Sequence, residues 1–158
     1  DAKLSNISSF AKDTIIELRD TIWAMNKSQI SFEDLQTRIH NFVDKAKEVK
    51  QEIQFNFFVD SDLKDRKFSS IEGMNIYRTI QEAIHNSIKY AEAKNIDIKV
   101  KKLGTQIAIE IKDDGKGFDV AAVAKGHGLF NMQKRITEIN GHFNLQSAAS
   151  GTEINILL

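Results

Sequence analysis

The 158-residue chain contains no cysteine and no proline. The absence of cysteine excludes a disulfide framework and thiol chemistry, and it suits a reducing compartment. The absence of proline allows long uninterrupted helices. No apolar run approaches the roughly 20 residues of a membrane-spanning helix, and no signal peptide is recognisable.

An excess of charge of either sign is also missing, because 22 basic residues balance 22 acidic ones. This balance gives no indication of nucleic acid or of an anionic membrane surface as a partner. The four histidines, His40, His85, His127 and His142, form no cluster with zinc-ligand spacing. The length suffices for one hydrophobic core, or for one domain with an appendage.

The apolar pattern predicts four helices and five strands. Apolar residues recur with helical period in four segments, at 1–25, 31–50, 73–91 and 128–139. They alternate with polar residues in five others, near 53–59, 96–101, 107–112, 143–145 and 154–156. Such alternation indicates a sheet with one buried face. We therefore predict an α/β (α+β) fold, a two-layer sandwich in which three helices cover a mixed five-stranded sheet, preceded by a long coiled-coil-like helix.

Capping patterns and polar segments predict where helices begin and end. Ser31 and Asp34 fit a helix-capping pattern, Asn140-Gly141 is typical of a helix end, and residues 60–70 are polar and suggest a loop. We place a domain boundary near residues 26–31, which separates a segment 1–28 from a domain 29–158.

The first helix carries an apolar seam with heptad spacing, made of Leu4, Ala11, Ile15, Leu18, Ile22 and Met25. A lone helix cannot cover such a seam, so we expect a packing partner in this chain or in a second copy. The alternative is a helix docked on its own domain.

Three polar residues of the 73–91 helix, Glu82, Asn86 and Lys89, share one face at positions i, i+4 and i+7. They combine a carboxylate that can take a proton, an amide oxygen that can bind a hard cation, and an ammonium for phosphate. Magnesium accepts few protein oxygens because it keeps several waters. The alternative is an ordinary solvated helix face.

Two glycine-containing clusters follow. Asp113-Asp-Gly115-Lys-Gly117 ends a predicted strand, where an aspartate can accept a hydrogen bond from an exocyclic amine and glycines allow close backbone approach. Gly126-His-Gly128 begins a predicted helix, whose free N–H groups favour an anion. A plain turn and a flexible helix start are the alternatives.

In their order and spacing, these clusters resemble the catalytic ATP-binding region of two-component sensor histidine kinases, in the ATPase superfamily shared with gyrase. Gln81–Tyr90 resembles the asparagine box of that family, and Asp113–Gly117 and Gly126–Leu129 resemble its two glycine boxes. Gly151-Thr152 resembles the final glycine–threonine motif. The short, alanine-rich segment 118–125 resembles the minimal nucleotide lid of the short-lid subfamily.

The resemblance implies a role for each matching residue. Glu82 would activate an attacking histidine, Asn86 would bind Mg²⁺, Lys89 would contact phosphate and Asp113 would bind adenine. The other positions predicted to bind the ATP cofactor are Tyr90, Gly115, Gly117, Gly126, His127, Gly128, Leu129 and Thr152. Tyr90 stands where the family often has histidine, which removes an imidazole contact. His127 is a candidate for a phosphate contact.

The resemblance also implies a function. The chain would bind Mg²⁺–ATP and pass the γ-phosphoryl group to a histidine on a preceding helix, absent from these residues, for relay to a response regulator receiver domain. Leu18–Met25 resembles the second helix of the dimerisation and phosphoacceptor module, which implies a homodimer. The chain would then be the cytoplasmic portion of a sensor anchored in a bacterial membrane by upstream segments. Two alternatives stay open, a non-catalytic nucleotide-gated dimerisation module and an anti-sigma-type serine kinase.

Overall fold

The computed structural model describes residues 2–123 and 127–158. Its helices and strands are α1 (Ala2–Met25), β1 (Gln29–Ser31), α2 (Phe32–Val49), β2 (Gln54–Val59), η1 (Ser61–Leu63), β3 (Lys67–Ser69), α3 (Ser70–Asn86), η2 (Ser87–Ala91), β4 (Asn95–Leu103), β5 (Gln106–Asp113), α4 (Val120–Val123), α5 (His127–Glu138), β6 (His142–Ala148) and β7 (Gly151–Leu157). Among these, no helix is long and apolar enough to cross a membrane.

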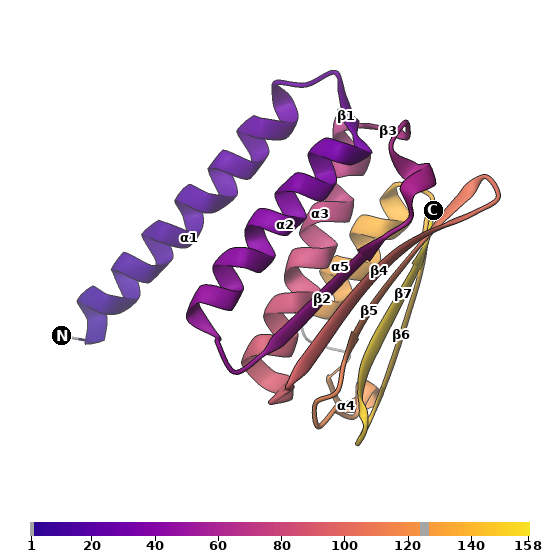
Figure 1. Ribbon diagram of the computed structural model, residues 1–158. Helices are drawn as coiled ribbons and strands as arrows, with labels where there is room; N and C mark the ends of the chain where they lie inside the picture. Colours follow the sequence, from indigo (N-terminus) through magenta and orange to yellow (C-terminus); the bar gives the residue numbers. More distant parts are fainter. Residues whose placement is uncertain (1, 124–126) are drawn as a thin grey trace.

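The main sheet has five strands in the order β2-β4-β5-β7-β6. The β2–β4 pair is parallel and the other pairs are antiparallel, so the sheet is mixed. Helices α2, α3 and α5 form a layer on one face of this sheet, and α1 lies outside that layer (Figure 1). The predicted two-layer architecture is therefore confirmed.

Side-chain alternation decides which face of the sheet is buried. Ile96, Ile98 and Val100 of β4 are at most 1% exposed and point to the helices. On the other face, Lys99 and Glu110 form an ion pair across β4 and β5 at 2.9 Å. The open face thus needs no covering layer, and the pattern read from the sequence locates the core correctly.

The polar loop predicted over residues 60–70 is partly wrong, because β3 lies in this segment. β3 pairs antiparallel with β1, which places Ile30 opposite Phe68. Both side chains are buried, at 0% and 4% exposed. A three-residue strand with one apolar side chain gives too little alternation to be recognised, and burial of these two residues stabilises the pair.

The helix boundaries follow local capping chemistry. The Ser31 side chain accepts a hydrogen bond from the Asp34 N–H, as predicted. The third helix starts at Ser70, three residues before its predicted start, because Ser69 and Glu72 form a complete capping box. At the end of α5, Asn140 has a φ of 59°, which confirms the predicted helix end.

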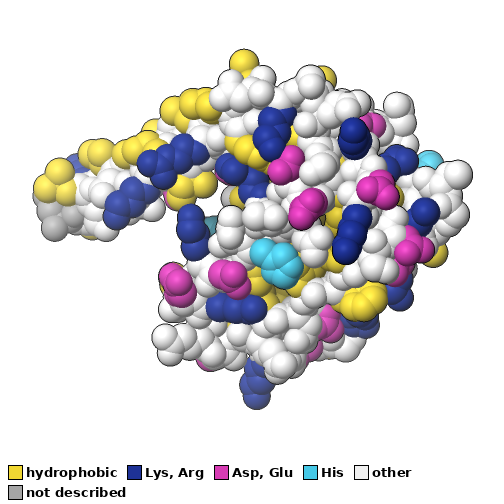
Figure 2. Space-filling view, turned by 45° about the horizontal axis from the view of Figure 1, so that its top comes forward, with side chains coloured by type: hydrophobic (Ala, Val, Ile, Leu, Met, Phe, Trp, Pro, Cys, Tyr) yellow, Lys and Arg dark blue, Asp and Glu magenta, His cyan; other side chains and the backbone are white. Residues whose placement is uncertain are grey.

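The apolar seam of α1 is left uncovered by the described part of the chain. Leu4, Ile15, Leu18, Ile22 and Met25 are 49–77% exposed, and Figure 2 shows apolar side chains along the projecting helix. The face of α1 that packs on its own domain is therefore not the face that carries this seam. The division into residues 1–28 and 29–158 stays a prediction.

The covered face of α1 is held by a partly buried cluster that we name the α1 clamp, made of Asp20, Trp23, Arg38 and Tyr77. Arg38 of α2 pairs with Asp20, which is 4% exposed. The guanidinium lies 4.5 Å from the centroid of the Trp23 ring and 5.5 Å from that of Tyr77. Burial raises the pKa of Tyr77 to about 12, so its hydroxyl stays neutral. One ion pair between two aromatic rings thus fastens α1 to the helical layer.

We expect Asp20→Ala to release α1, because it leaves the Arg38 guanidinium without its counter-charge. The Arg38 side chain is 25% exposed, so we expect a loss below the roughly 3 kcal/mol of a fully buried pair. Trp23 is the single tryptophan of the chain, so its fluorescence maximum will shift to longer wavelength as the ring enters water. Asp13→Ala, at an exposed position of the same helix, is the control. An unshifted maximum in Asp20→Ala would contradict the role of the clamp.

Candidate functional site

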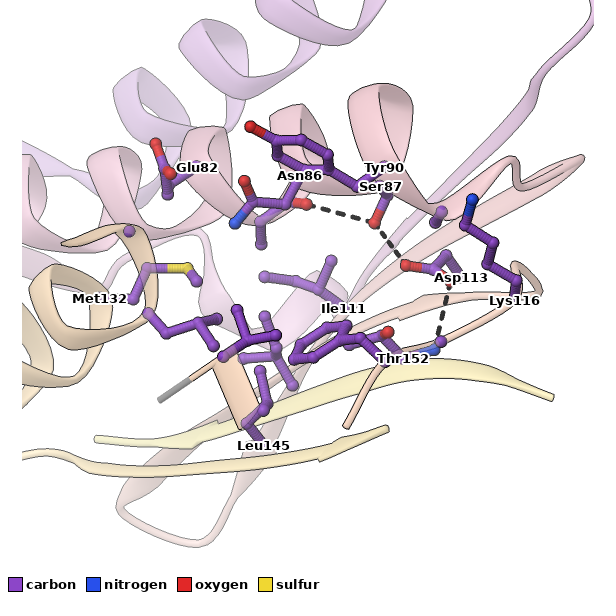
Figure 3. Close-up of a pocket in the computed structure, with 18 of the residues that line it drawn as sticks. Glu82, Asn86, Ser87, Tyr90, Ile111, Asp113, Lys116, Met132, Leu145 and Thr152 are labelled. Carbon is purple, nitrogen blue, oxygen red and sulfur yellow. Dashed lines mark hydrogen bonds between the residues drawn. The ribbon is translucent and has the colours of Figure 1, made fainter. Parts of the chain in front are cut away.

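A cavity of about 540 Å³ opens between the end of α3, the end of β5, the start of β7 and the start of α5 (Figure 3). Its size is that of a small-molecule site. Its lining residues come from segments far apart in sequence and are Glu82, Ala83, Asn86, Ser87, Tyr90, Ala91, Ile111, Asp113, Lys116, Gly117, Phe118, Val123, His127, Gly128, Leu129, Met132, Leu145, Thr152 and Ile154. Asn86 and Asp113 therefore face one shared cavity.

The start of α5 approaches the polar face of α3 closely at Gly128. A Cβ atom at Gly128 would lie 2.6 Å from Glu82 Oε1 and 3.8 Å from Asn86 Nδ2. Only a residue without a side chain allows this approach while Glu82 keeps its position. The carboxylate, the carboxamide and the first turn of α5 thus meet at one end of the cavity.

Asp113 marks the other end of the cavity, and its carboxylate accepts three hydrogen bonds. It is 3% exposed. Its Oδ2 accepts a hydrogen bond from the Ser87 hydroxyl at 2.6 Å, and its Oδ1 accepts from the N–H groups of Gly115 at 3.0 Å and Thr152 at 3.2 Å. Figure 3 shows Ser87 and Thr152 on either side of this carboxylate. Three donors from three segments hold its orientation, and a carboxylate has lone pairs left for a further donor.

The neighbouring Asp114 has a purely structural role. Its Oδ1 accepts hydrogen bonds from the backbone N–H groups of Lys94 and Asn95, at 2.8 and 2.9 Å. Hydrogen bonds from the Asn95 side chain and backbone hold the pKa of Asp114 below its usual value. Asp114 joins the start of β4 to the end of β5 outside the cavity, so only the first of the two adjacent aspartates can contact a ligand there.

The two glycines after Asp113 are needed for close packing within the chain. A Cβ at Gly115 would lie 2.3 Å from the carbonyl oxygen of Ala91, and one at Gly117 would lie 1.8 Å from that of Ala148. Gly117 also has a φ of 62°, in the left-handed region. Gly117 lines the cavity, whereas Gly115 contacts the chain behind it.

Not every predicted site residue reaches the cavity. Lys89 is exposed and is absent from the lining, and its ammonium lies 5.0 Å from the centroid of the Tyr90 ring. Lys116 lines the cavity in its place, although its ammonium pairs with Glu92. Gly126 lies outside the described residues. Tyr90, His127, Leu129 and Thr152 line the cavity, and their contact with a nucleotide stays a prediction.

Several lining residues were missed by the sequence analysis. Apolar side chains of Ile111, Met132, Leu145 and Ile154 form part of the cavity walls. Strand and helix periodicity identifies these residues as core, but it does not tell which core residues border a cavity. Ser87 directly follows Asn86, and its hydrogen bond to Asp113 depends on a contact between residues 26 apart in sequence.

Comparisons with known proteins find similar sequences and similar folds. The profile of the family described as histidine kinase-, DNA gyrase B- and HSP90-like ATPases matches residues 72–158. An uncharacterised sensor-like histidine kinase of Chloroflexus aurantiacus is 30% identical over 166 aligned positions, covering 99% of this chain and 28% of the relative. The chain therefore spans less than a third of that relative's length.

Solved structures resemble this chain in fold. The histidine kinase AdeS of Acinetobacter baumannii superposes with a TM-score of 0.72 and 17% identity, over 99% of this chain and 81% of that one. The histidine kinase domain of a blue-light activated histidine kinase of Erythrobacter litoralis superposes with a TM-score of 0.70 and 15% identity, over 84% and 64%. At these identities the similarity shows the fold alone.

Two glycines with the same φ angle allow a matched test of the close packing next to Asp113. Gly104 and Gly117 both have a φ of 62°, but a Cβ at Gly104 would meet nothing within 4 Å. We expect Gly104→Ala to lower the free energy of unfolding by about 1 kcal/mol, the cost of the left-handed conformation. Gly117→Ala also displaces Ala148, so we expect about 2 kcal/mol more. Urea denaturation measures both, and equal losses would contradict the packing argument.

Proposed function

The chain belongs to the family of histidine kinase-, DNA gyrase B- and HSP90-like ATPases, and we propose that it is the ATP-binding kinase core of a sensor histidine kinase. The observation that carries this proposal is the shared cavity of Asn86 and Asp113. These residues lie on α3 and β5, and they supply the two different contacts that a magnesium–nucleotide complex requires, one at the phosphates and one at the base.

The Asp113 end of the cavity suits adenine. The carboxylate accepts hydrogen bonds and cannot donate one when ionised, so it pairs with the exocyclic amine of adenine and repels the carbonyl oxygen that guanine carries at that position. Ile111 and Ile154 lie beside it in the lining, where they can contact the faces of a purine ring. Thr152 lies next to Asp113 and borders the same end.

The Asn86 end suits phosphates and Mg²⁺. Among the described residues, no group of three or more His, Asp and Glu side chains could hold a metal ion by itself. That composition fits Mg²⁺, which keeps several waters and binds through few protein oxygens together with nucleotide phosphates. The Asn86 amide oxygen would be the protein ligand, and the Mg²⁺ would offset phosphate charge. The N–H groups at the start of the 12-residue helix α5 favour the same anionic groups.

Lys89 does not line the cavity. Its side chain is exposed, and a phosphate contact requires its ammonium to leave the Tyr90 ring and turn toward the cavity. His127, the first residue of α5, already lines the cavity.

Glu82 would act as the general base. An attacking histidine presented at this end would lose its imidazole proton to the Glu82 carboxylate, directly or through one water. The histidine nitrogen then bonds to the γ-phosphorus while the bond from that phosphorus to the β–γ bridging oxygen breaks, which releases ADP. Asn86 and the backbone near Gly128 would orient the phosphates for this transfer, so catalysis would be mainly positioning and charge stabilisation.

The partners follow from the same proposal. The phosphohistidine would pass its phosphoryl group to an aspartate of a response regulator receiver domain. The exposed apolar seam of α1 supports a homodimer through this helix. It also favours the second candidate function, a nucleotide-gated dimerisation module without phosphotransfer. We place the chain in the cytoplasmic portion of a membrane-bound sensor.

Calorimetric titration tests the base contact. We expect the wild-type chain to bind ATP in preference to GTP. Asp113→Asn should weaken ATP binding roughly ten- to a hundred-fold, because it replaces a charged acceptor that contacts the amine. Asp114→Asn removes the same charge one position away and outside the cavity, so it should leave affinity unchanged. Equal binding of GTP and ATP would contradict the role of Asp113.

Phosphotransfer separates the two candidate functions. With radiolabelled ATP, we expect no acid-labile label on the 158-residue chain alone, but label on an added phosphoacceptor helix that contains a histidine. Glu82→Gln should slow this transfer by roughly 10²–10⁴-fold while ATP binding stays unchanged. Acid-labile label on the chain alone would contradict the assignment, and silence with the added helix would favour the dimerisation module.

A further inference from the structure

A line of hydrogen bonds continues from Asp113 to a residue outside the cavity. The Thr152 N–H donates to Asp113 Oδ1 at 3.2 Å, and the Thr152 hydroxyl lies 2.8 Å from the hydroxyl of Ser147 on β6. Ser147 Oγ also accepts a hydrogen bond from the N–H of Phe118 at 2.9 Å. Asp113, Thr152 and Phe118 line the cavity, whereas Ser147 does not.

Ser147 contacts the segment 117–118, which leads from the Asp113 end of the cavity toward α4. Gly117 packs against the end of β6, where its Cβ position is 1.8 Å from the Ala148 carbonyl oxygen and 3.0 Å from Ser147 Oγ. Phe118 comes next and forms part of the cavity wall. The backbone contact at Gly117 and the hydrogen bond at Phe118 thus fasten two consecutive residues to the same strand end.

The β6–β7 hairpin does not need the Ser147 hydroxyl for its own pairing. Seven residue pairs join the two strands, from His142–Leu157 to Ala148–Gly151. These pairings use backbone groups, which a change of side chain at 147 leaves in place. The hydroxyl is therefore free to serve the contacts with Phe118 and Thr152.

We propose that Ser147 is a positioning residue for nucleotide binding, which holds Phe118 and Thr152 in register with Asp113 without touching the ligand. This inference rests on the proposed function, since it assigns the base of the nucleotide to the Asp113 end. Without the Ser147 hydroxyl, the Phe118 N–H loses its acceptor and Thr152 loses its hydroxyl partner. The base would then meet a wall that is not held in place, while the phosphate contacts stay unchanged.

Two measurements on Ser147→Ala test the proposal. The first is hydrogen exchange of the Phe118 amide in the nucleotide-free chain, which we expect to become about five-fold faster, the size of one lost hydrogen bond. The second is calorimetric affinity, which we expect to fall by about the same factor for ATP and for ADP. The loss is equal because both nucleotides share the base, and a γ-phosphate contact would affect ATP alone.

Two further variants serve as a rescue and as a control. Ser147→Thr keeps a hydroxyl at the same position, so it should restore exchange and affinity toward the wild-type values. Ser150→Ala changes an exposed serine of the same hairpin turn and should alter neither. Urea denaturation of Ser147→Ala checks that the fold is retained, since a general loss of stability would raise exchange throughout the sheet rather than at Phe118.

The outcomes separate this inference from the proposed function. An exchange rate of the Phe118 amide in Ser147→Ala equal to that of the wild type would overturn the inference. Faster exchange with unchanged affinity for ATP and ADP would also overturn it. Both results leave ATP binding by the wild-type chain intact. A wild-type chain that binds neither nucleotide would overturn the proposed function, and with it the role given to Ser147.

Discussion

The buried carboxylate of Asp113 is the constraint on which the candidate site depends. It lies at the end of β5, and its donors come from the end of the α3–η2 helix, from β7 and from its own turn. A buried carboxylate must be hydrogen-bonded to be tolerated, so these segments must meet at this point. Because they meet there, the Asp113 carboxylate has a fixed orientation at one end of the cavity.

The second constraint is the approach of α5 to α3 at the other end. The glycine at 128 brings the first turn of α5 against Glu82 and Asn86, while Met132 and Ile136 of the same helix are fully buried and anchor it. The α1 clamp lies on the far side of the helical layer, where Tyr77 precedes Glu82 by little more than one turn of α3. Helix α3, which carries Glu82 and Asn86, is thus packed on both sides.

Much of this arrangement could be predicted from the sequence, and the exceptions have physical causes. Period-two alternation identified the five strands because one sheet face is buried, and motif order identified the family that the profile match shows. β1 and β3 were missed because three-residue strands show no period. Lys89 follows helical spacing from Asn86, yet the helix changes to a π-helical turn at Ser87, which alters the direction of later side chains. The links through Ser87 and Ser147 are tertiary, so no local pattern reveals them.

The central claim is that Asn86 and Asp113 contact opposite ends of one purine nucleotide. A crystal structure of the chain with Mg²⁺ and a non-hydrolysable ATP analogue tests it most directly. We expect the adenine amine within hydrogen-bond distance of the Asp113 carboxylate, and the Asn86 amide oxygen bound to the Mg²⁺ that the phosphates hold. A nucleotide seated elsewhere, or one that contacts only one of these two residues, would contradict it.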